Sequence, residues 1–167
     1  NNLENYRIPE AARALQDFVD EMSNWYVRRS RERFWAKGME QDKVNAYMTL
    51  YTALVTVCKA AAPMIPFMTE EIYQNIVRSV DASAKESIHL CDFPVYNAEQ
   101  VDEKLEADMD LVLKIVVLGR ACRNGAAIKN RQPIGQMYVK AEASLPDYDE
   151  AIILDELNVK NITFTDD

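Results

Sequence analysis

Residues 9–37 read PEAARALQDFVDEMSNWYVRRSRERFWAK, and their spacing is that of one long amphipathic helix. At 100° per residue the apolar side chains form a single stripe, as in a helix that packs on a core: Leu15, Phe18, Val19, Met22 and Tyr26. Pro9 suits a first helical turn, and Gly38 suits a helix end. Arg29 and Arg33 continue the apolar line, so we expect them to extend their charged ends to solvent, to meet carboxylates, or to face a partner outside the bundle.

Three more helices follow from the same reasoning. Residues 42–62 are apolar except for a narrow polar strip, which predicts a central, mostly buried helix that ends before Pro63. A shorter helix is predicted from Thr69, which can act as its N-cap, to about Ser79. A connection over 81–97, with a short extended piece at 87–90, leads to a long helix over 98–127. Arg123 falls on the apolar stripe of that helix.

Beyond Pro133 the pattern changes from helical to mixed. A strand over 136–141, a helix over 149–157 and a strand over 159–164 predict a small β-α-β element. Two strands alone make a marginal sheet, so we expect this element to belong to a larger C-terminal region that the chain truncates. The predicted fold class is mainly α, with a helical bundle over 1–134 and a small α/β appendage over 135–167.

The net charge of −8 disfavours general binding to nucleic acid, yet the basic residues are concentrated in two windows. Residues 28–37 hold five basic residues and one acid, and residues 114–131 hold five basic residues and no acid. The rest of the chain is therefore strongly acidic. Such a distribution predicts a protein that repels polyanions generally but binds one at a chosen place.

Composition restricts the compartment and the type of site. The cysteines Cys58, Cys91 and Cys122 are odd in number and far apart, which favours free thiols and a cytoplasmic protein. The longest apolar run, residues 111–118, is too short for a membrane span, and no secretory signal is recognised at residues 1–4. His89 and Cys91 lack a second pair of ligands, so no metal site is expected.

Residues 25–35, WYVRRSRERFW, resemble the signature helix in the anticodon-binding domain of isoleucyl-tRNA synthetases. Three later stretches match that family in the same order: APMIPFMTEEIY at 62–73, SIHLCDFP at 87–94, and residues 121–134 with their KNRQP core. Ile134 departs conservatively from the leucine that the family often has. The valyl, leucyl and methionyl families share the helical bundle, whereas the run at 25–31 points to isoleucine. The resemblance therefore implies the helical bundle of a class I aminoacyl-tRNA synthetase anticodon-binding domain.

The resemblance also implies a parent enzyme, an isoleucine–tRNA ligase that uses ATP to charge tRNA(Ile). The ATP-binding motifs of class I synthetases, of the His-Ile-Gly-His and Lys-Met-Ser-Lys-Ser types, are missing, since the single histidine, His89, is followed by Leu90. We therefore expect no catalytic residue and no cofactor in this chain, while ATP and any zinc belong to the parent. The expected partners are tRNA(Ile) and the catalytic and editing domains of the same chain, in a monomer without a membrane.

The exposed loop after the long helix is the first candidate for tRNA contact. Lys129 and Arg131 offer positive charge without nearby acids, and Asn130 and Gln132 have amides that can read base edges. The helix before the loop adds two further candidates, Arg120 and Arg123.

The first basic window supplies the remaining candidates. Arg28 and Arg31 are three residues apart and hence neighbours on a helix, while Trp25 and Trp35 project in similar directions and offer planes on which an unpaired base can stack. Arg29 and Arg33 are expected at an interface with the catalytic domain. Glu32 and Trp35 are expected to have structural roles.

Each of these residues also has a purely structural explanation. Cations at a helix end interact with its dipole and pair with local acids, tryptophans pack, and a polar turn can simply be solvated. Two alternatives to isoleucine-specific tRNA recognition stay open: the equivalent domain of a valyl- or leucyl-type synthetase, and a scaffold module that docks on the catalytic domain.

Overall fold

The structure is a computed structural model that describes residues 2–141 and 145–165. The chain forms two compact units, Asn1–Tyr96 and Asn97–Asp167. This division groups the long helix with the small α/β element, whereas the sequence predicted a boundary after residue 134. The mainly helical fold with a small C-terminal α/β element is confirmed.

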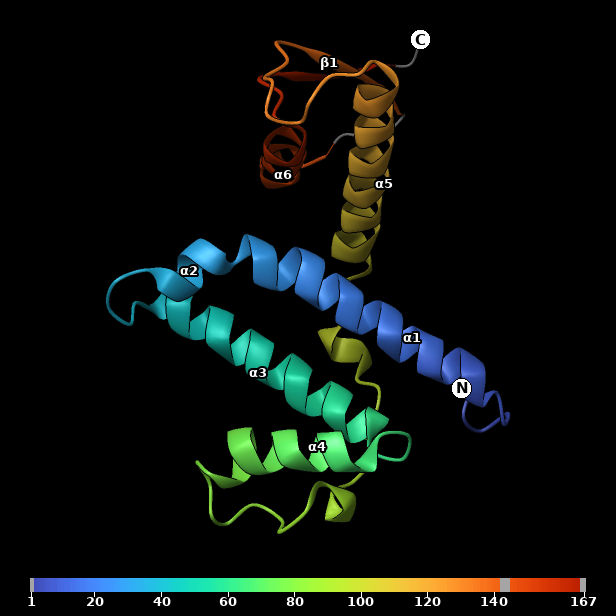
Figure 1. The fold of residues 1–167 in the computed structure, drawn as a ribbon, viewed down its shortest axis with the longest axis vertical. Coiled ribbons are helices and arrows are strands. Elements are labelled where there is room, and N and C mark those ends of the chain that lie inside the picture. Colours follow the sequence, from blue (N-terminus) through green and yellow to red (C-terminus); the bar gives the residue numbers. More distant parts are fainter. Residues whose placement is uncertain (1, 142–144, 166–167) are drawn as a thin grey trace. The chain divides into compact units, whose positions relative to one another are not determined.

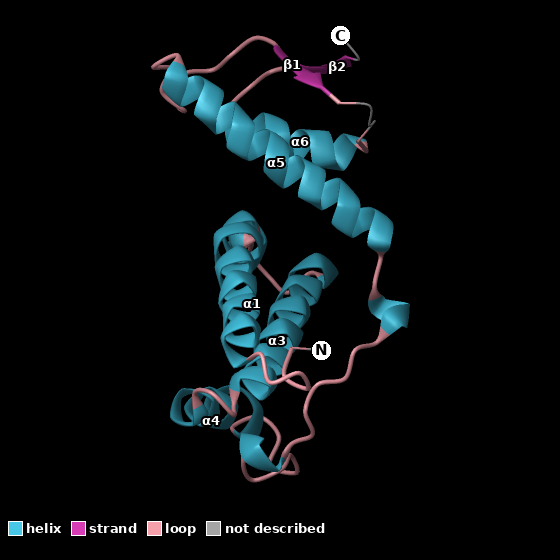
Figure 2. Cartoon of the chain, turned by 90° about the vertical axis from the view of Figure 1, so that its right-hand side faces the viewer, coloured by secondary structure: helices cyan, strands magenta, loops and turns pink. Residues whose placement is uncertain are grey.

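In residues 2–96 the regular secondary structure of the first unit is all helical, and loops connect the helices (Figures 1 and 2). It contains α1 (Ile8–Glu21), a π-helical segment (Met22–Val27), α2 (Arg31–Trp35), α3 (Gln41–Ala61) and α4 (Pro66–Tyr73), which continues as a π-helical segment (Gln74–Arg78). The helix α1 and its continuation run beside α3, and α4 packs on α3.

The first predicted helix is interrupted, which changes the faces that its side chains occupy. The π-helical segment Met22–Val27 follows α1 directly, and a turn at Ser30 separates it from α2. A π-helical turn holds more residues than an α-helical turn, so a projection at 100° per residue fails beyond it. The π-helical segment rotates the later side chains relative to α1. The prediction that Arg29 and Arg33 continue the apolar line of α1 is therefore wrong.

The core of the first unit lies where α3, α4 and the following connection meet. Its buried residues are Cys58, Ala62, Tyr73 and Ile88, and Ile72, Val77 and Cys91 pack against them. At the other end of α3, the Tyr26 hydroxyl donates a hydrogen bond to the carbonyl oxygen of Ala46 at 3.0 Å. The ring centroids of Phe34 and Tyr47 are 5.0 Å apart. These contacts attach the residues around α2 to α3.

Two local predictions in the first unit are wrong. The fourth residue of α4 is Thr69, which is 1% exposed and donates to the carbonyl oxygen of Ile65 at 3.0 Å, so it does not cap the helix. The helix begins earlier because Pro66 is favourable in a first turn. The expected extended piece at 87–90 is a 3-10 turn, Ile88–Leu90, because Ser87 caps it. Its hydroxyl oxygen accepts a hydrogen bond from the N–H of His89.

In residues 97–141 and 145–165 the second unit contains two α-helices and a parallel pair of strands. After a 3-10 turn (Ala98–Gln100) come α5 (Glu103–Gly125), β1 (Met137–Lys140), α6 (Asp147–Leu157) and β2 (Ile162–Thr165). The strands pair with Met137 opposite Ile162, and both helices lie against one face of this small sheet (Figure 2). The β-α-β element predicted for this region is therefore present.

The helices α5 and α6 approach each other closely. A Cβ atom at Gly119 would lie 2.3 Å from Cδ1 of Leu157, so any larger residue at this position requires the Leu157 side chain to shift. Val112, Val116 and Ile153 are 0% exposed and form the centre of the interface. No helix in residues 2–141 and 145–165 has the length and hydrophobicity that a membrane span requires.

Candidate nucleic-acid interface

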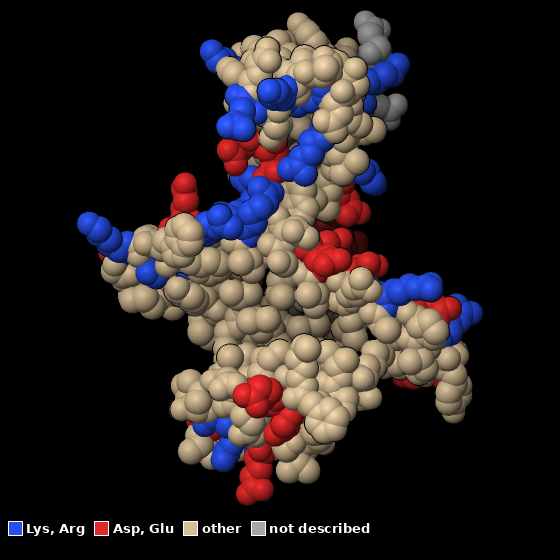
Figure 3. Space-filling model, in the orientation of Figure 1, with Lys and Arg blue, Asp and Glu red and all other residues tan. Residues whose placement is uncertain are grey.

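The first basic window forms an exposed cluster of arginine and tryptophan side chains in the first unit. Arg28 is exposed, its Nε donates to the carbonyl oxygen of Asn24 at 2.7 Å, and its Cζ lies 5.6 Å from the ring centroid of Trp25. The Cζ of Arg31 lies 5.5 Å from the ring centroid of Trp35. Figure 3 shows Lys and Arg side chains gathered over this part of the unit. Each arginine therefore covers a tryptophan face, an arrangement in which cation and ring attract each other.

Trp35 is more open than the sequence suggested. It was expected to be structural, yet 75% of its surface is exposed, whereas Trp25 is partly buried. Trp35 is the last residue of α2, three residues before Gly38, whose φ of 76° turns the chain. An aromatic ring before a glycine at a helix end was the sequence signal that could have identified this exposed ring.

Arg33 has a carboxylate partner within the first unit. Its Nε and Nη2 donate to the two carboxylate oxygens of Asp42 at 2.8 and 2.7 Å. The hydrogen bond to Arg33 holds the pKa of the Asp42 carboxyl below its ordinary value. This bidentate pair links α2 to the start of α3, so Arg33 serves an internal contact. Arg29 is half-buried and also has an interaction partner.

The second basic window ends in a tightly closed helix terminus. The N–H of Ile128 donates to the carbonyl oxygen of Arg123 at 2.9 Å, and the N–H of Ala127 donates to that of Asn124 at 3.1 Å. These two bonds form a Schellman motif, in which one residue adopts the left-handed conformation. Ala127 has φ 55° and occupies that place. The motif ends α5 and directs residues 128–134 into a loop.

Arg123 lies inside this loop instead of on the surface. It is 5% exposed, and its Nη2 donates to the carbonyl oxygens of Lys129 at 2.8 Å, Asn130 at 3.2 Å and Gln132. The apolar stripe of α5 therefore does carry Arg123 inward, as its spacing suggested. A direct contact between Arg123 and tRNA is not supported by this placement, because the side chain is enclosed by the loop.

Two other candidate residues are held by α6. The Nη2 of Arg120 lies 2.6 Å from Oε2 of Glu156, whose side chain is 3% exposed, so this pair joins α5 to α6. The amide nitrogen of Asn130 donates to the carbonyl oxygen of Glu156 at 3.4 Å, and Asn158 donates to the carbonyl oxygen of Asn130 at 3.2 Å. Arg120 and Asn130 thus fasten the loop and its helix to α6.

The remaining loop side chains are exposed: Lys129, Arg131 and Gln132. Among residues 2–141 and 145–165, no carboxylate forms an ion pair with Lys129 or Arg131. The loop therefore presents two cations and an amide outward, while its carbonyl oxygens at 129, 130 and 132 turn inward. This is a surface suited to phosphate and to base edges.

Comparison with known proteins identifies this arrangement. A family profile described as the anticodon-binding domain of tRNA ligase matches residues 1–139. The chain belongs to this family. The anticodon-binding domain is 57% identical over 163 residues to an isoleucine–tRNA ligase of Clostridium novyi and 56% identical over 164 residues to one of Clostridium acetobutylicum. Both alignments cover 98% of the chain.

More distant relatives carry the same name. An isoleucine–tRNA ligase of Dehalococcoides mccartyi is 47% identical over 95% of the chain. The anticodon-binding domain spans only about 16% of the length of these relatives. The family predicted from residues 25–35 and from the three later stretches is thus confirmed, and the relatives found are isoleucine–tRNA ligases.

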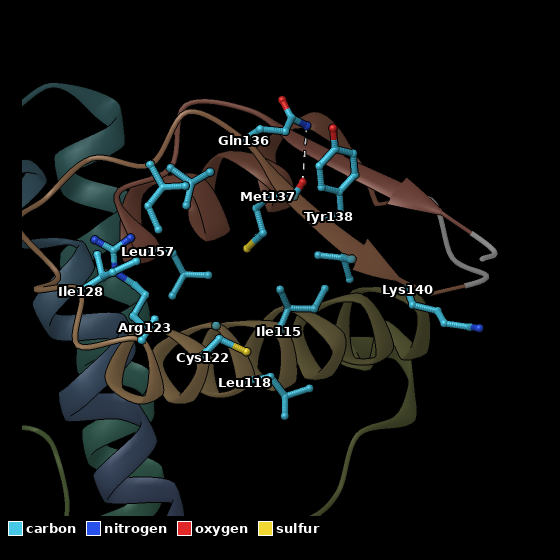
Figure 4. A pocket seen from close by; sticks show the side chains of 15 residues that line it. Ile115, Leu118, Cys122, Arg123, Ile128, Gln136, Met137, Tyr138, Lys140 and Leu157 are labelled. Carbon is cyan, nitrogen blue, oxygen red and sulfur yellow. Dashed lines mark hydrogen bonds between the residues drawn. The ribbon is translucent and has the colours of Figure 1, made fainter.

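The anticodon-binding domain also contains a cavity of about 510 Å³ in its second unit, between α5 and the sheet. Figure 4 shows Met137 and Leu157 directed toward it and Arg123 at one end, beside Ile128. Most of the lining side chains are apolar, with Gln136 and Lys140 at the rim. In residues 2–141 and 145–165, no group of three or more His, Cys, Asp or Glu side chains has the spacing of a metal site.

Proposed function

We propose that this anticodon-binding domain recognises tRNA(Ile) as part of an isoleucine–tRNA ligase, and that Lys129, Arg131 and Gln132 make the contact. One observation carries the proposal: the loop turns its carbonyl oxygens inward and its cations outward. RNA affinity depends on cations that reach phosphates without competing acids, and specificity depends on donors that reach unpaired bases. Arg28, Arg31 and Trp25 are a second candidate contact, on the first unit.

The family supports the wider role of the parent. The relatives are isoleucine–tRNA ligases, which favours isoleucine over the valyl- and leucyl-type alternatives. The parent then attaches isoleucine to tRNA(Ile) with ATP in the cytoplasm, as a monomer, and any zinc belongs to other parts of that protein. The other parts supply the chemistry, and this domain supplies recognition.

A charge-reversal experiment tests the loop. The chain with Lys129→Glu and Arg131→Glu should bind tRNA(Ile) at least about tenfold more weakly at ~0.1 M salt, because it replaces two phosphate contacts by repulsion. The slope of log affinity against log salt should become less steep by about two. Fluorescence anisotropy with labelled tRNA(Ile), in a salt series, measures both quantities.

A matched control separates local contact from net charge. Lys140 and Lys160 are exposed cations of the same unit, so Lys140→Glu with Lys160→Glu changes the net charge by the same amount. We expect this control to lose much less affinity. Equal losses in the two double variants, or no loss in the loop variant, would contradict a specific role of the loop.

A second role, docking on the other domains of the parent, is favoured by apolar surface on the first unit. Phe67 is 90% exposed and Trp35 is 75% exposed. In the full-length ligase, Phe67→Ser should lower aminoacylation without changing the affinity of the isolated chain for tRNA(Ile). A decrease in tRNA affinity of the isolated chain would assign Phe67 to RNA contact instead.

A further inference from the structure

Arg123 is a buried cation whose partners are all main-chain oxygens. It is 5% exposed, and no carboxylate of residues 2–141 and 145–165 forms an ion pair with it. A buried charge without a counter-ion costs free energy unless dipoles surround it. Here its Nη2 donates hydrogen bonds to the carbonyl oxygens of residues 129, 130 and 132. The loop is therefore wrapped around the guanidinium.

This wrapping decides which groups of the loop face outward. The carbonyl oxygens that accept hydrogen bonds from Arg123 point inward. The side chains of Lys129, Arg131 and Gln132 are exposed to solvent. A second hydrogen bond closes the turn, since the N–H of Gln132 donates to the carbonyl oxygen of Lys129 at 2.9 Å. Exposed carbonyl oxygens would repel a phosphate, whereas the observed surface attracts it.

The charge of Arg123 adds to this surface. Its Nε and Nη1 are buried and have no hydrogen-bond partner among the described residues, 2–141 and 145–165. The carbonyl dipoles at Nη2 therefore solvate one side of the guanidinium only, and its full positive charge remains beneath the loop. Charges in a medium of low dielectric constant act over longer distances than charges in water. The buried cation thus raises the electrostatic potential at the positions of Lys129 and Arg131.

We propose that Arg123 is a positioning residue for RNA recognition: it touches no RNA itself, but it sets the shape and the polarity of the loop that does. The proposal rests on the proposed function for the identity of the ligand, a phosphate-bearing RNA loop. A lysine should replace the arginine only in part: its Nζ also offers several donors on one nitrogen, as Nη2 of Arg123 does, but its ammonium is more strongly hydrated and costs more to bury.

The test combines hydrogen exchange with a mutant cycle. In Arg123→Met, the amides of residues 128–134 should exchange at least about tenfold faster than in the unaltered chain. The reason is that the loop loses the hydrogen bonds that Arg123 donates to its carbonyl oxygens. Affinity for tRNA(Ile) should fall by about tenfold. Lys114→Met removes an exposed cation of the same helix and should change neither quantity by more than about twofold.

The mutant cycle decides between positioning and direct contact. In a chain that already carries Lys129→Ala and Arg131→Ala, the change Arg123→Met should have almost no further effect on tRNA affinity. Equal effects in both backgrounds would show that Arg123 contacts RNA or acts apart from the loop, and would overturn the proposal. Unchanged hydrogen exchange of the loop amides would overturn it as well.

A second variant covers the case in which Arg123→Met is unfolded, and the loop variant separates failure of the proposed function from failure of the positioning role. If Arg123→Met does not fold, Arg123→Lys is measured instead, and it should retain part of the affinity while the loop exchanges faster. If Lys129→Ala with Arg131→Ala leaves tRNA affinity unchanged, the loop is not the RNA contact and the proposed function fails. The exchange measurement then still reports whether Arg123 holds the loop.

Discussion

Two carboxylate side chains of this domain, Glu70 and Asp149, have contrasting surroundings. Glu70 accepts hydrogen bonds from the Ser87 hydroxyl at 2.8 Å, the Ile88 N–H at 2.9 Å and the Gln74 amide at 2.7 Å. These bonds attach the connection after α4 to that helix. Asp149 has the opposite surroundings, because it is 2% exposed and its Oδ2 has no hydrogen-bond partner in the part of the chain that the structure describes.

The surroundings of Glu70 predict a loss of stability in acid. Burial alone would raise the pKa of its carboxyl, but the hydrogen bonds from Ser87, Gln74 and Ile88 outweigh burial and lower that pKa. A lowered folded pKa means that Glu70 stabilises the fold above the unfolded value and that this stabilisation disappears as pH falls through the folded value. Glu70→Gln should therefore lower the free energy of unfolding by about 1 kcal/mol at pH 7.

Urea unfolding of this variant at pH 7 and below pH 4 measures the effect. The difference from the unaltered chain should shrink in acid. Glu71→Gln, at the exposed neighbouring position, is the control and should have little effect at either pH. A difference for Glu70→Gln that is equally large in acid would contradict the electrostatic explanation.

Asp149 should show the reverse dependence on pH. Burial, with a smaller contribution from the Asp108 carboxylate, raises the pKa of Asp149 above 3.8, and Lys104 opposes this in part. The folded state then holds the proton more tightly than the unfolded state, so stability falls as pH rises from the unfolded value through the folded one. Asp149→Asn should raise the free energy of unfolding at pH 7 by about 1 kcal/mol and flatten this decline.

Thermal unfolding of the Asp149 variant across pH 3–8 provides the measurement. Asp147→Asn, in the same first turn of α6 but exposed, is the matched control. The explanation fails if Asp149→Asn destabilises the chain at neutral pH, since that would mean that the charged form is the favoured one.

Helix ends and helix interruptions decide where the candidate side chains point. The π-helical segment Met22–Val27 changes the phase of the residues after it, and the Schellman motif at the end of α5 directs the loop at 128–134. Neither feature adds a functional group. Both determine which of the nearby arginines lie on the surface.

The end of α5 carries a strained residue that can be relieved. Ala127 has φ 55°, a conformation that costs a residue with a Cβ atom roughly 1 kcal/mol relative to glycine. Ala127→Gly should therefore raise the free energy of unfolding by about 0.5–1 kcal/mol. Ala126→Gly is the control, because Ala126 has φ −86° and glycine there only adds flexibility to the unfolded chain. Chemical denaturation should rank Ala127→Gly above the unaltered chain and Ala126→Gly below it.

At the scale of the whole molecule, the domain consists of two units that are each compact. The first extends to Tyr96 and the second begins at Asn97. Residues 95–100 are exposed along their whole length, and Val95 and Tyr96 are 90% and 77% exposed. The net charge of the whole chain is negative, so RNA binding depends on where cations are locally concentrated and not on the net charge.

Limited proteolysis should therefore cut between the units first. Chymotrypsin is expected to cleave after Tyr96, which is 77% exposed and lies outside helices of more than one turn. The exposed aromatic residues Phe67 and Tyr138 lie within α4 and β1, whose hydrogen bonds protect them. Mass spectrometry of the earliest fragments identifies the site. A first cut within α4 or β1 would contradict the division into units.

The sequence alone was sufficient for the properties that repeat locally along the chain. Helical periodicity located α3 within one residue at each end and predicted the mixed element after Pro133. The residues of the 25–35 stretch and of the KNRQP core were enough to predict the family. Local propensity and side-chain chemistry determine such features, so a single chain displays them before it folds.

Only the tertiary structure decided which cations are available. Arg33, Arg120 and Arg123 look like Arg31 and Arg131 in the sequence, yet the first three have partners within the fold: Asp42, Glu156 and the carbonyl oxygens of the loop. Those partners lie 9 and 36 residues away for Arg33 and Arg120. Pairing of this kind depends on how helices approach one another, which no local pattern encodes. Lys129 and Arg131, by contrast, are exposed and form no ion pair within residues 2–141 and 145–165.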